Sequence, residues 1–297
     1  MTLDRSLLQS LALGAIAAGS LGLGAQGAAA APGRIPPAAA ASPPPVAAVS
    51  FAGYDWAVKA PTSTWGPGPN WWSANNVSVD AAGRLHLKIT QRRGQWYCAE
   101  VTLGQELGYG TYRFSVDSSL GSLDPNVILG MFTWSDDPAQ NDREMDIEIS
   151  RWGSTTDPTN AQYVVQPAGP AGHLTRFTQP ATPARSVQSF TWLPGQVDFA
   201  TTTAAGVPIA HTDYVGSDVP TPGSERVHIN LWLYGGQAPT SAAGVEVTLA
   251  GFSFVPATTS DIATAAVAPP ALFGIGLFGP SAGTIGSSET ASAELGV

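Results

Sequence analysis

The chain has a single cysteine, Cys98, so no disulfide bond can form within it and the fold must rely on a hydrophobic core. Charged residues are also scarce, at 12% of the sequence, and the balance is acidic, with 13 Lys and Arg against 22 Asp and Glu. The absence of a basic cluster argues against nucleic acid as a partner. No glycine-rich loop follows a predicted strand and opens a helix, so no nucleotide site is predicted.

The sequence also lacks a group of residues with the spacing of metal ligands. Its histidines are scattered, and we expect each of them to be an ordinary surface or sheet residue rather than a ligand or a catalytic base. The prediction is therefore no metal site and no required cofactor. The histidines are His86, His173, His211 and His228.

The N-terminal part of the sequence differs in composition from the middle. An apolar run from Leu7 to about Ala25 is followed by small residues at the A-x-A spacing up to Ala31. This pattern predicts a signal peptide over residues 1–31 and a secreted protein, with an uncleaved anchor as the alternative. Residues 32–49 are rich in Pro and Ala and are predicted to form a flexible linker.

The C-terminal residues 257–297 are rich in Ala, Thr, Ser and Gly, which predicts a disordered tail. The apolar stretch at residues 270–278 is far shorter than the ~20 residues of a spanning helix, so we expect no stable membrane span. Attachment to a cell surface through this tail is the weaker alternative. Residues 50–256 remain as one domain with its own core, which we expect to be monomeric.

Between residues 80 and 256, apolar residues recur at every second position, the period of a strand with one buried face. Turn signals such as Ala82-Gly83 and Pro194-Gly195 separate these runs, and no amphipathic helix is evident. The pattern predicts an all-β fold, a jelly-roll sandwich of two antiparallel sheets. A change of phase near Gly251 predicts a bulge. The clearest alternating positions are Leu85, Leu87, Ile89, Tyr112, Phe114, Val116, Ile229, Leu231 and Leu233.

The most informative motif runs from Glu144 to Glu148 and places carboxylates at alternate positions, with Asp146 between the two Glu residues. In an extended strand these carboxylates share one face. They repel one another unless some are protonated or paired, so we expect a functional reason for them. Glycoside hydrolysis uses such a pair, one carboxylate as nucleophile and one as proton donor, and Asp146 can hold the two pKa values apart. A solvated strand edge that deters aggregation is the alternative.

The strand predicted at residues 228–234 carries polar and aromatic side chains on the face opposite its aliphatic residues. Asn230, Trp232 and Tyr234 lie on this face, where rings can stack on a sugar and an amide can bind its hydroxyl groups. A loop that covers the face is the alternative. Trp134, just before the acidic motif, admits the same two interpretations.

Six short motifs lie between residues 83 and 255: Ala99-Glu100, Gly108 to Tyr112, Phe132 to Trp134, Glu144 to Glu148, Phe190 to Gly195, and Asn230 to Trp232. In this order and at these spacings they resemble the family 16 glycoside hydrolases, the group of bacterial lichenases and laminarinases that includes plant xyloglucan-acting enzymes. The uninterrupted E-x-D-x-E is similar to the lichenase and xyloglucan branch.

The resemblance implies a jelly roll whose concave sheet is the substrate cleft. It also implies a secreted endo-acting enzyme that hydrolyses a β-linked polysaccharide, first of all a β-1,3/1,4-glucan, with retention of configuration. By the same resemblance, Glu144 is the nucleophile, Asp146 the assisting carboxylate and Glu148 the acid/base. A structural calcium held by backbone carbonyls is known in the family and leaves no sequence signal. The residues expected to bind substrate are Trp134, Asn230, Trp232, Tyr234 and Glu100.

The chain departs from the family pattern in three places. Thr102 stands where lichenases often have Arg, the segment after Pro194-Gly195 lacks the usual Trp-Tyr-x-Asp-Gly ending, and the disulfide of some lichenases is impossible here. These departures leave the glucan preference open. The competing functions are a carbohydrate-binding jelly roll without turnover, a transglycosylase, and a structural surface protein. Release of reducing sugar would exclude the first, and the non-core tryptophans disfavour the last.

Overall fold

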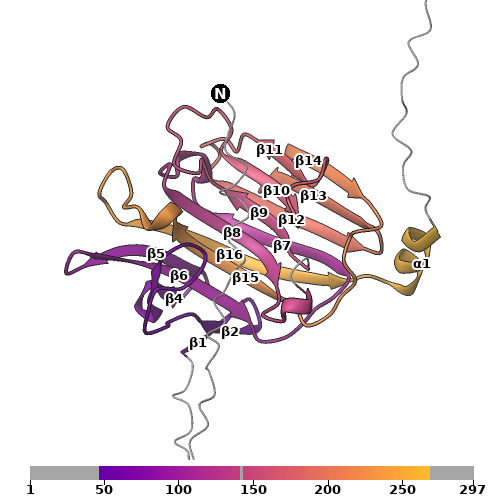
Figure 1. Ribbon diagram of the computed structural model, residues 1–297, viewed down its shortest axis with the longest axis horizontal. Helices are drawn as coiled ribbons and strands as arrows, with labels where there is room; N and C mark the ends of the chain where they lie inside the picture. The colour runs from indigo at the N-terminus through magenta and orange to yellow at the C-terminus, as the bar shows by residue number, and fades with distance from the viewer. Residues whose placement is uncertain (1–46, 141–142, 268–297) are drawn as a thin grey trace, which may run out of the picture.

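Strands make up nearly all the regular structure of the computed structural model, which describes residues 47–140 and 143–267 (Figure 1). Short 3-10 helices lie at Ala74–Asn76, Leu120–Ser122, Pro138–Gln140 and Tyr234–Gly236, and one α-helix, α1, at Thr259–Val267. The strands are β1 (Ala48–Phe51), β2 (Tyr54–Val58), β3 (Trp71–Trp72), β4 (Val77–Val79), β5 (Leu85–Arg92), β6 (Gln95–Leu103), β7 (Gly110–Asp117), β8 (Val127–Trp134), β9 (Met145–Ile149), β10 (Ala161–Val165), β11 (Leu174–Phe177), β12 (Arg185–Leu193), β13 (Gln196–Thr203), β14 (Pro208–Val215), β15 (Arg226–Leu233) and β16 (Val245–Pro256).

The strands form two antiparallel sheets that are joined by the β5–β6 hairpin (Figure 1). In the first sheet the order is β11-β10-β9-β8-β15-β6, and β2 continues it beyond β6. In the second sheet the order is β5-β16-β7-β12-β13-β14, with β4 also beside β5. Among the described strands, β3 alone runs parallel to its neighbour, β6. The prediction of an all-β jelly roll of two antiparallel sheets is confirmed.

A hydrophobic core fills the space between the two sheets. Tyr163 of the first sheet stacks on Phe199 of the second, with ring centroids 5.0 Å apart. Each large side chain buried here stabilises the fold by about 1.5–3 kcal/mol. The alternation identified this core correctly, because all nine residues that it singled out are buried: Leu85, Leu87, Ile89, Tyr112, Phe114, Val116, Ile229, Leu231 and Leu233.

Strand β16 bends where the sequence predicts a bulge. Its first half pairs with β5 and its second half with β7, and the register with β7 shifts between Leu249 and Gly251. An extra residue at such a point increases the local twist and lets one strand serve two partners. The bulge predicted near Gly251 is therefore confirmed.

The start of the predicted C-terminal tail needs a correction. Residues 257–297 were expected to lack regular structure, but α1 forms directly after Thr258. The Thr258 Oγ1 accepts the Asp261 N–H at 3.2 Å, and the Asp261 Oδ2 accepts the Thr258 N–H at 2.8 Å. This reciprocal capping box is a local signal that the composition argument overlooked. The helix lies beside the sandwich rather than on it (Figure 1).

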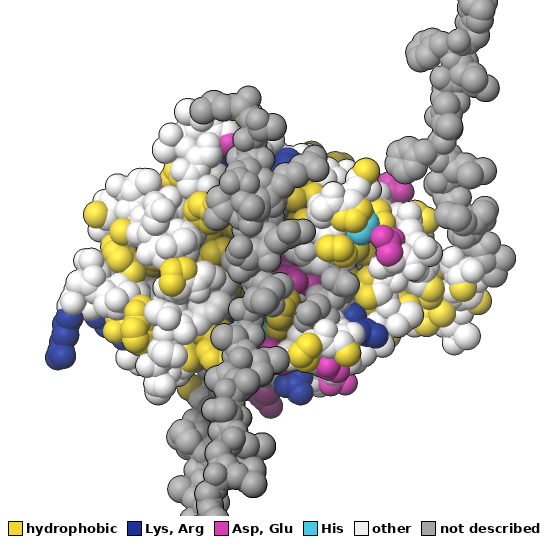
Figure 2. All heavy atoms as spheres, viewed as in Figure 1, with side chains coloured by type: hydrophobic (Ala, Val, Ile, Leu, Met, Phe, Trp, Pro, Cys, Tyr) yellow, Lys and Arg dark blue, Asp and Glu magenta, His cyan; other side chains and the backbone are white. Residues whose placement is uncertain are grey.

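The predicted signal peptide, most of the predicted linker and the apolar stretch at residues 270–278 lie outside the described residues. Within the described part of the chain, no helix is long and apolar enough to cross a membrane. The visible surface is mostly apolar and neutral polar, with few Lys or Arg side chains (Figure 2).

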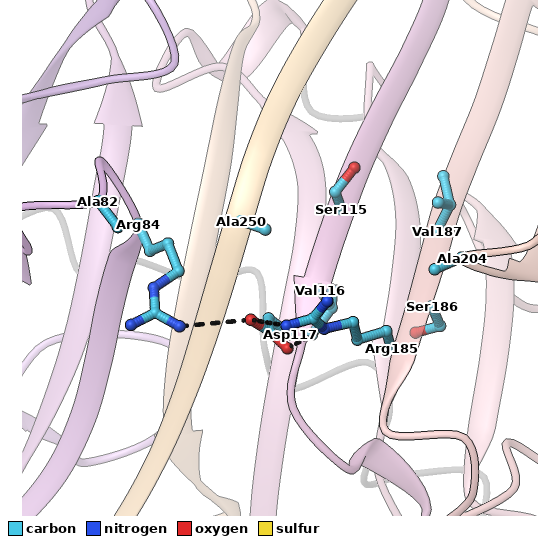
Figure 3. Close-up of a pocket in the computed structure, with 10 residues that line it drawn as sticks. All are labelled: Ala82, Arg84, Ser115, Val116, Asp117, Arg185, Ser186, Val187, Ala204 and Ala250. Carbon is cyan, nitrogen blue, oxygen red and sulfur yellow. Dashed lines mark hydrogen bonds and ion pairs between the residues drawn. The ribbon is translucent and has the colours of Figure 1, made fainter.

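The outer side of the second sheet has a shallow depression of about 470 Å³ (Figure 3). Small side chains such as Ser115 and Ala250 form part of its wall, and Arg84 and Arg185 approach it from either side of Asp117. Asp117 is already paired with both arginines, at 3.4 Å to Arg84 Nη1 and 2.7 Å to Arg185 Nε. The depression therefore presents paired charges and no second carboxylate.

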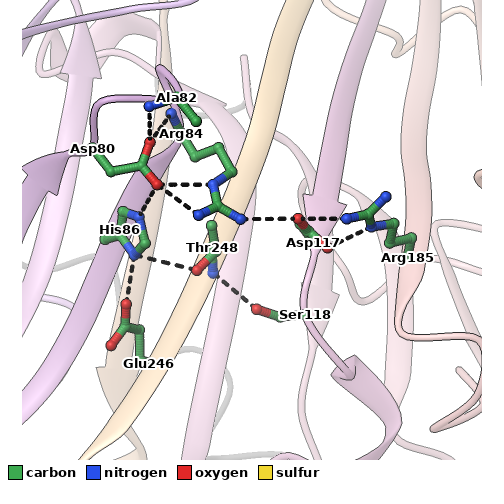
Figure 4. A network of polar contacts seen from close by, with 9 residues as sticks. All are labelled: Asp80, Ala82, Arg84, His86, Asp117, Ser118, Arg185, Glu246 and Thr248. Carbon is green, nitrogen blue, oxygen red and sulfur yellow. Dashed lines mark hydrogen bonds and ion pairs between the residues drawn. The ribbon is translucent and has the colours of Figure 1, made fainter.

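These ion pairs continue into a larger network on the same side of the sheet (Figure 4). Asp80 Oδ2 lies 2.8 Å from Arg84 Nη2 and 3.1 Å from His86 Nε2. Because the network links the turn before β5 with β5, β7, β12 and β16, it ties strands across the second sheet. We call it the outer network; it consists of Asp80, Arg84, His86, Asp117, Arg185 and Glu246.

Candidate active site

Strand β9 presents its acidic and apolar residues on opposite sides, as the alternation predicts. The apolar residues of the motif are fully buried in the core, so Asp146 and Glu148 lie on the other side of the first sheet. Glu144 directly precedes the strand and extends its pairing, since its carbonyl accepts the Gln166 N–H at 3.0 Å. We call this side of the first sheet the acidic face.

A row of residues crosses the acidic face from β6 to β11. Strand register places its six members opposite one another on neighbouring strands, so the row spans roughly 24 Å at about 4.8 Å per strand. Two residues expected to bind substrate, Glu100 and Asn230, are brought into line with Glu148 in this way. In order across the sheet, the row is Glu100, Asn230, Gly130, Glu148, Gln162 and Arg176.

Asp146 is buried, with 3% of its surface exposed, and it has hydrogen-bond partners on both sides. Its Oδ2 accepts the Nε2–H of Gln166 at 3.1 Å, and the Gln166 amide is held in this orientation because its Oε1 accepts the Ala168 N–H at 3.0 Å. The carboxyl group is also hydrogen-bonded to Glu144. Burial, and then the charge and hydrogen bond of Glu144, raise the pKa of Asp146 well above its usual value. Both effects favour the neutral form of Asp146.

Glu148 holds its proton at neutral pH. Burial raises the pKa of Glu148 to about 8, and the neighbouring Asp146 contributes to the rise. The hydrogen bond from Gln162, at 2.7 Å from Nε2 to Oε2, and the positive charge of Arg176 act in the opposite direction without outweighing the burial. A carboxylic acid that is neutral at pH 7 can donate a proton.

Gln162 fixes which oxygen of Glu148 carries that proton. The Gln162 Oε1 accepts hydrogen bonds from Arg176 Nη1 at 3.0 Å and from Trp152 Nε1 at 3.2 Å. Both of these groups can only donate, so the amide nitrogen of Gln162 must face Glu148. Because that nitrogen donates to Oε2, the proton of neutral Glu148 lies on Oε1. Arg176 is itself held by Asp157 at 2.9 Å.

Gly130 makes room for the Asn230 side chain in the row between Asn230 and Glu148. A β-carbon at Gly130 would lie 2.5 Å from the Asn230 Oδ1, so no other residue fits without displacing that side chain. The Gly130 N–H donates to the same oxygen at 3.1 Å and orients the amide. Among the described residues the Asn230 Nδ2 has no hydrogen-bond partner. This nitrogen is not fully buried.

Trp232 lies on the predicted side of β15, but its ring is covered. Only 3% of its surface is exposed. Trp152 packs edge-on against it with centroids 6.0 Å apart, and a β-carbon at Gly68 would lie 3.9 Å from the ring. The expectation of an open ring face for sugar stacking is therefore corrected, and the alternative of a covering segment applies. Tyr234 packs against Trp152 at 5.9 Å and is half-buried.

Trp134 on β8 and Glu100 on β6 are the other two residues expected to bind substrate. Trp134 ends β8, one alternate position beyond the Phe132–Asp146 pair, and it is partly exposed, with its Nε1 donating to Asp136 Oδ1 at 3.2 Å. It keeps the accessible ring that Trp232 lacks. Glu100 is buried and held by an ion pair 2.8 Å long to Lys59.

Sequence reasoning missed four residues that complete the site: Trp152, Gln162, Gln166 and Arg176. A signal existed for the two glutamines, because Gln162 lies within the otherwise apolar strand β10 and Gln166 directly follows it on the same side, where a polar side chain needs a reason. Trp152 and Arg176 carry no such signal, since only the fold brings them to Gln162. Among residues 47–140 and 143–267, no group of three or more His, Cys, Asp or Glu is placed to hold a metal ion.

No protein-family model and no curated protein sequence matches the chain. Solved structures do: a β-glucanase of Bacillus licheniformis has 19% identity and a TM-score of 0.53, covering 68% of this chain and 92% of that one. A family 16 protein from the mixed-linkage glucan locus of Bacteroides ovatus, solved with its G4G4G3G product, has 13% identity and a TM-score of 0.53, covering 67% and 94%. An immunostimulatory antigen and pseudo β-1,3-glucanase of Mycobacterium tuberculosis has 19% identity and a TM-score of 0.51, covering 68% and 91%. The chain has the fold of the family 16 glycoside hydrolases.

Proposed function

We propose that the chain is a retaining endo-β-glycanase that hydrolyses a β-linked glucan through a covalent glycosyl-enzyme. The observation that carries this proposal is the division of protons within the acidic motif. The pKa values of Asp146 and Glu148 are raised, and the charge of Glu144 is one cause of the rise at Asp146. One ionised and one protonated carboxyl group are what a retaining mechanism requires.

In the first step, Glu148 gives the proton on Oε1 to the glycosidic oxygen while the bond from that oxygen to the anomeric carbon breaks. A carboxylate oxygen of Glu144 forms a bond to the anomeric carbon from the opposite side, and the leaving chain departs as an alcohol. Asp146 stabilises the Glu144 carboxylate through their hydrogen bond before attack.

In the second step, Glu148 is ionised and acts as a base. It takes a proton from water as the water oxygen attacks the anomeric carbon, and the bond to Glu144 breaks. The two displacements restore the original configuration, and the enzyme returns with Glu148 protonated and Glu144 ionised. The hydrogen bond from Gln162 stays on Oε2 throughout, so the same Oε1 serves as acid and as base.

The substrate that we propose is an uncharged β-glucan of the mixed-linkage type. Neighbours of the same fold are named for β-1,3-1,4-glucan or its product, and the acidic face offers amide, carboxyl and imidazole groups that suit sugar hydroxyl groups. Secretion is part of the proposal and rests on residues 1–31; detection of the processed chain in the culture medium tests it.

The test is reducing-sugar release from lichenan, laminarin, xyloglucan, agarose and carrageenan, with the anomeric configuration of the first product followed by proton NMR. We expect turnover of a glucan and an initial β-anomer. An initial α-anomer would contradict the retaining mechanism, and the absence of turnover on all substrates would contradict hydrolysis.

A second candidate function is glucan binding without turnover. It is favoured by one finding, that the same fold occurs in a protein described as a pseudo β-1,3-glucanase. The raised pKa of Glu148 favours turnover instead. A buried acid costs stability when it ionises, and sugar binding alone does not require one, whereas a proton donor does. Binding to glucan-coated resin without release of reducing sugar would favour the second candidate.

A further inference from the structure

A buried polar cluster adjoins the row on the acidic face, at its β6 end. His228 Nδ1 lies 3.0 Å from Glu100 Oε1, and Lys59 Nζ lies 2.8 Å from Glu100 Oε2. The ammonium group of Lys59 also donates to Gly66 O at 2.7 Å and lies over the ring of Trp72, 4.2 Å from its centroid. Glu100 is therefore held from both sides, and none of its partners belongs to the acidic motif.

The cluster determines which nitrogen of His228 carries hydrogen. Burial alone would raise the pKa of Glu100, but the hydrogen bonds and charges of His228 and Lys59 outweigh it and lower the pKa. The carboxylate can only accept, so Nδ1 is the nitrogen that donates. Thr102 Oγ1, 3.2 Å from Nδ1, is a second neighbour on the same side of the ring.

The other ring nitrogen, Nε2, has no hydrogen-bond partner within the described part of the chain. Although only 9% of the surface of His228 is exposed, its Nε2 is not fully buried and reaches the surface. The ring plane is fixed by Phe132, which stacks on it with centroids 5.1 Å apart and an angle of 29°. His228 is opposite Phe132 in the register, and Phe132 is opposite Asp146, so His228 lies two strands, or roughly 10 Å, from the acidic motif.

We propose that His228 determines specificity on the acidic face: its Nε2 forms a hydrogen bond with a hydroxyl group of the sugar unit bound beside the acidic motif. Glu100 and Lys59 position the imidazole rather than contact the sugar. The inference rests on the proposed function. It also changes an expectation from the sequence, since the hydrogen bonds of His228 are satisfied at Nδ1 only. His228 lies opposite Thr102, the position where lichenases often have an Arg.

Two substitutions separate the two nitrogens. His228→Asn keeps an amide nitrogen near the position of Nδ1, for Glu100, and removes Nε2; His228→Gln reaches the position of Nε2 with an amide oxygen or nitrogen. We expect His228→Asn to raise KM about 3–10-fold, the scale of one hydrogen bond, with kcat nearly unchanged and with a normal melting temperature. His228→Gln should keep a KM closer to that of the wild type.

The matched control is His211→Asn. His211 also pairs with a carboxylate, Asp198, at 2.7 Å, but it lies on β14 of the second sheet, and its substitution should leave KM unchanged. Equal KM values for His228→Asn and the wild type, or equal effects of His228→Asn and His228→Gln, would overturn the proposal. If His228→Asn does not fold, His228→Gln and the wild type are compared on intact glucan and on a glucan modified at its hydroxyl groups. A smaller preference for intact glucan in His228→Gln supports the proposal, and identical preferences overturn it.

Failure of the proposed function has a different signature. A wild-type chain that turns over no polysaccharide would overturn hydrolysis and leave His228 open to a binding measurement. In that case affinity electrophoresis of the wild type and His228→Asn in gels containing lichenan replaces the kinetics. The same loss of affinity for His228→Asn supports the role of His228, and identical migration of the two overturns it.

Discussion

Asp146 and Glu148 of the acidic motif and the carboxyl groups of the outer network respond to their surroundings in opposite ways. On the acidic face, burial raises the pKa of Asp146 and Glu148. In the outer network, the hydrogen bond from Arg185 lowers the pKa of Asp117, and the backbone N–H of Arg84 and the side chain of His86 lower that of Asp80. The partners decide the difference: guanidinium, imidazole and backbone N–H donors stabilise the charged form, whereas burial next to other acids stabilises the neutral form.

This contrast separates a structural use of carboxyl groups from a chemical one. A carboxylate that is neutralised by Arg ties strands together and cannot donate a proton. A carboxyl group that keeps its proton at neutral pH is a strained component of the fold and is expected at a reacting centre. The predictions below test the contrast, from the largest expected effect to the smallest.

Glu144→Gln should have the largest effect. It removes the negative charge beside Asp146 and the carboxylate oxygen that attacks the anomeric carbon. Turnover of the best glucan should therefore fall by more than the ~10²–10⁴-fold that loss of an acid/base costs. The melting temperature should stay close to that of the wild type, because Gln has the same shape. A variant with near-normal turnover would make the acidic face a charged surface like the outer network.

Glu148→Ala should lower turnover of polysaccharide by about 10²–10⁴-fold. Substrates with an activated leaving group need little acid, so the step that releases the leaving group should be largely retained, and azide should replace water in the second step. The measurement is the rate on aryl glycosides and on lichenan, with and without azide. If azide has no effect and both substrates slow equally, Glu148 is not the acid/base.

The pH profile of kcat/KM should have its alkaline limb near pH 8, where Glu148 loses its proton. Arg176 stabilises the ionised form by its charge, so Arg176→Gln should raise the pKa of Glu148 further and move this limb to higher pH. Arg185→Gln in the outer network is the control and should leave the limb unchanged. A limb that moves to lower pH in Arg176→Gln would contradict the assignment.

Asp117→Asn should have the smallest effect and should act on stability alone. Its partners Arg84 and Arg185 are largely exposed, so we expect a loss of about 0.5–1 kcal/mol at pH 7 by chemical denaturation. Since the folded pKa of Asp117 is lowered, its stabilisation is present above the ordinary pKa of about 4 and is lost as the pH falls through the folded value. The wild type and the variant should therefore converge in acid, and activity should be unchanged. A loss that persists at low pH would show that packing, not charge, sets the contribution.

The sequence alone determined the strands and the acidic motif. The period of two in β5, β7 and β15 is local, because successive side chains of an extended chain point to opposite sides whatever the partner strand is. The phase change at Gly251 and the spacing of Glu144, Asp146 and Glu148 are equally local, so these predictions hold in the structure.

The tertiary structure decided which side chains meet. Register across six strands placed Gln162 opposite Glu148 and Arg176 opposite Gln162, and no local pattern encodes a register between segments far apart in the sequence. The same applies to Trp232, whose face of β15 was predicted correctly but whose covering by Trp152 was not, and to His228, which meets Glu100 only because β15 pairs with β6. Proton positions on the acidic face follow from burial and from these cross-strand neighbours, which exist only once the chain has folded.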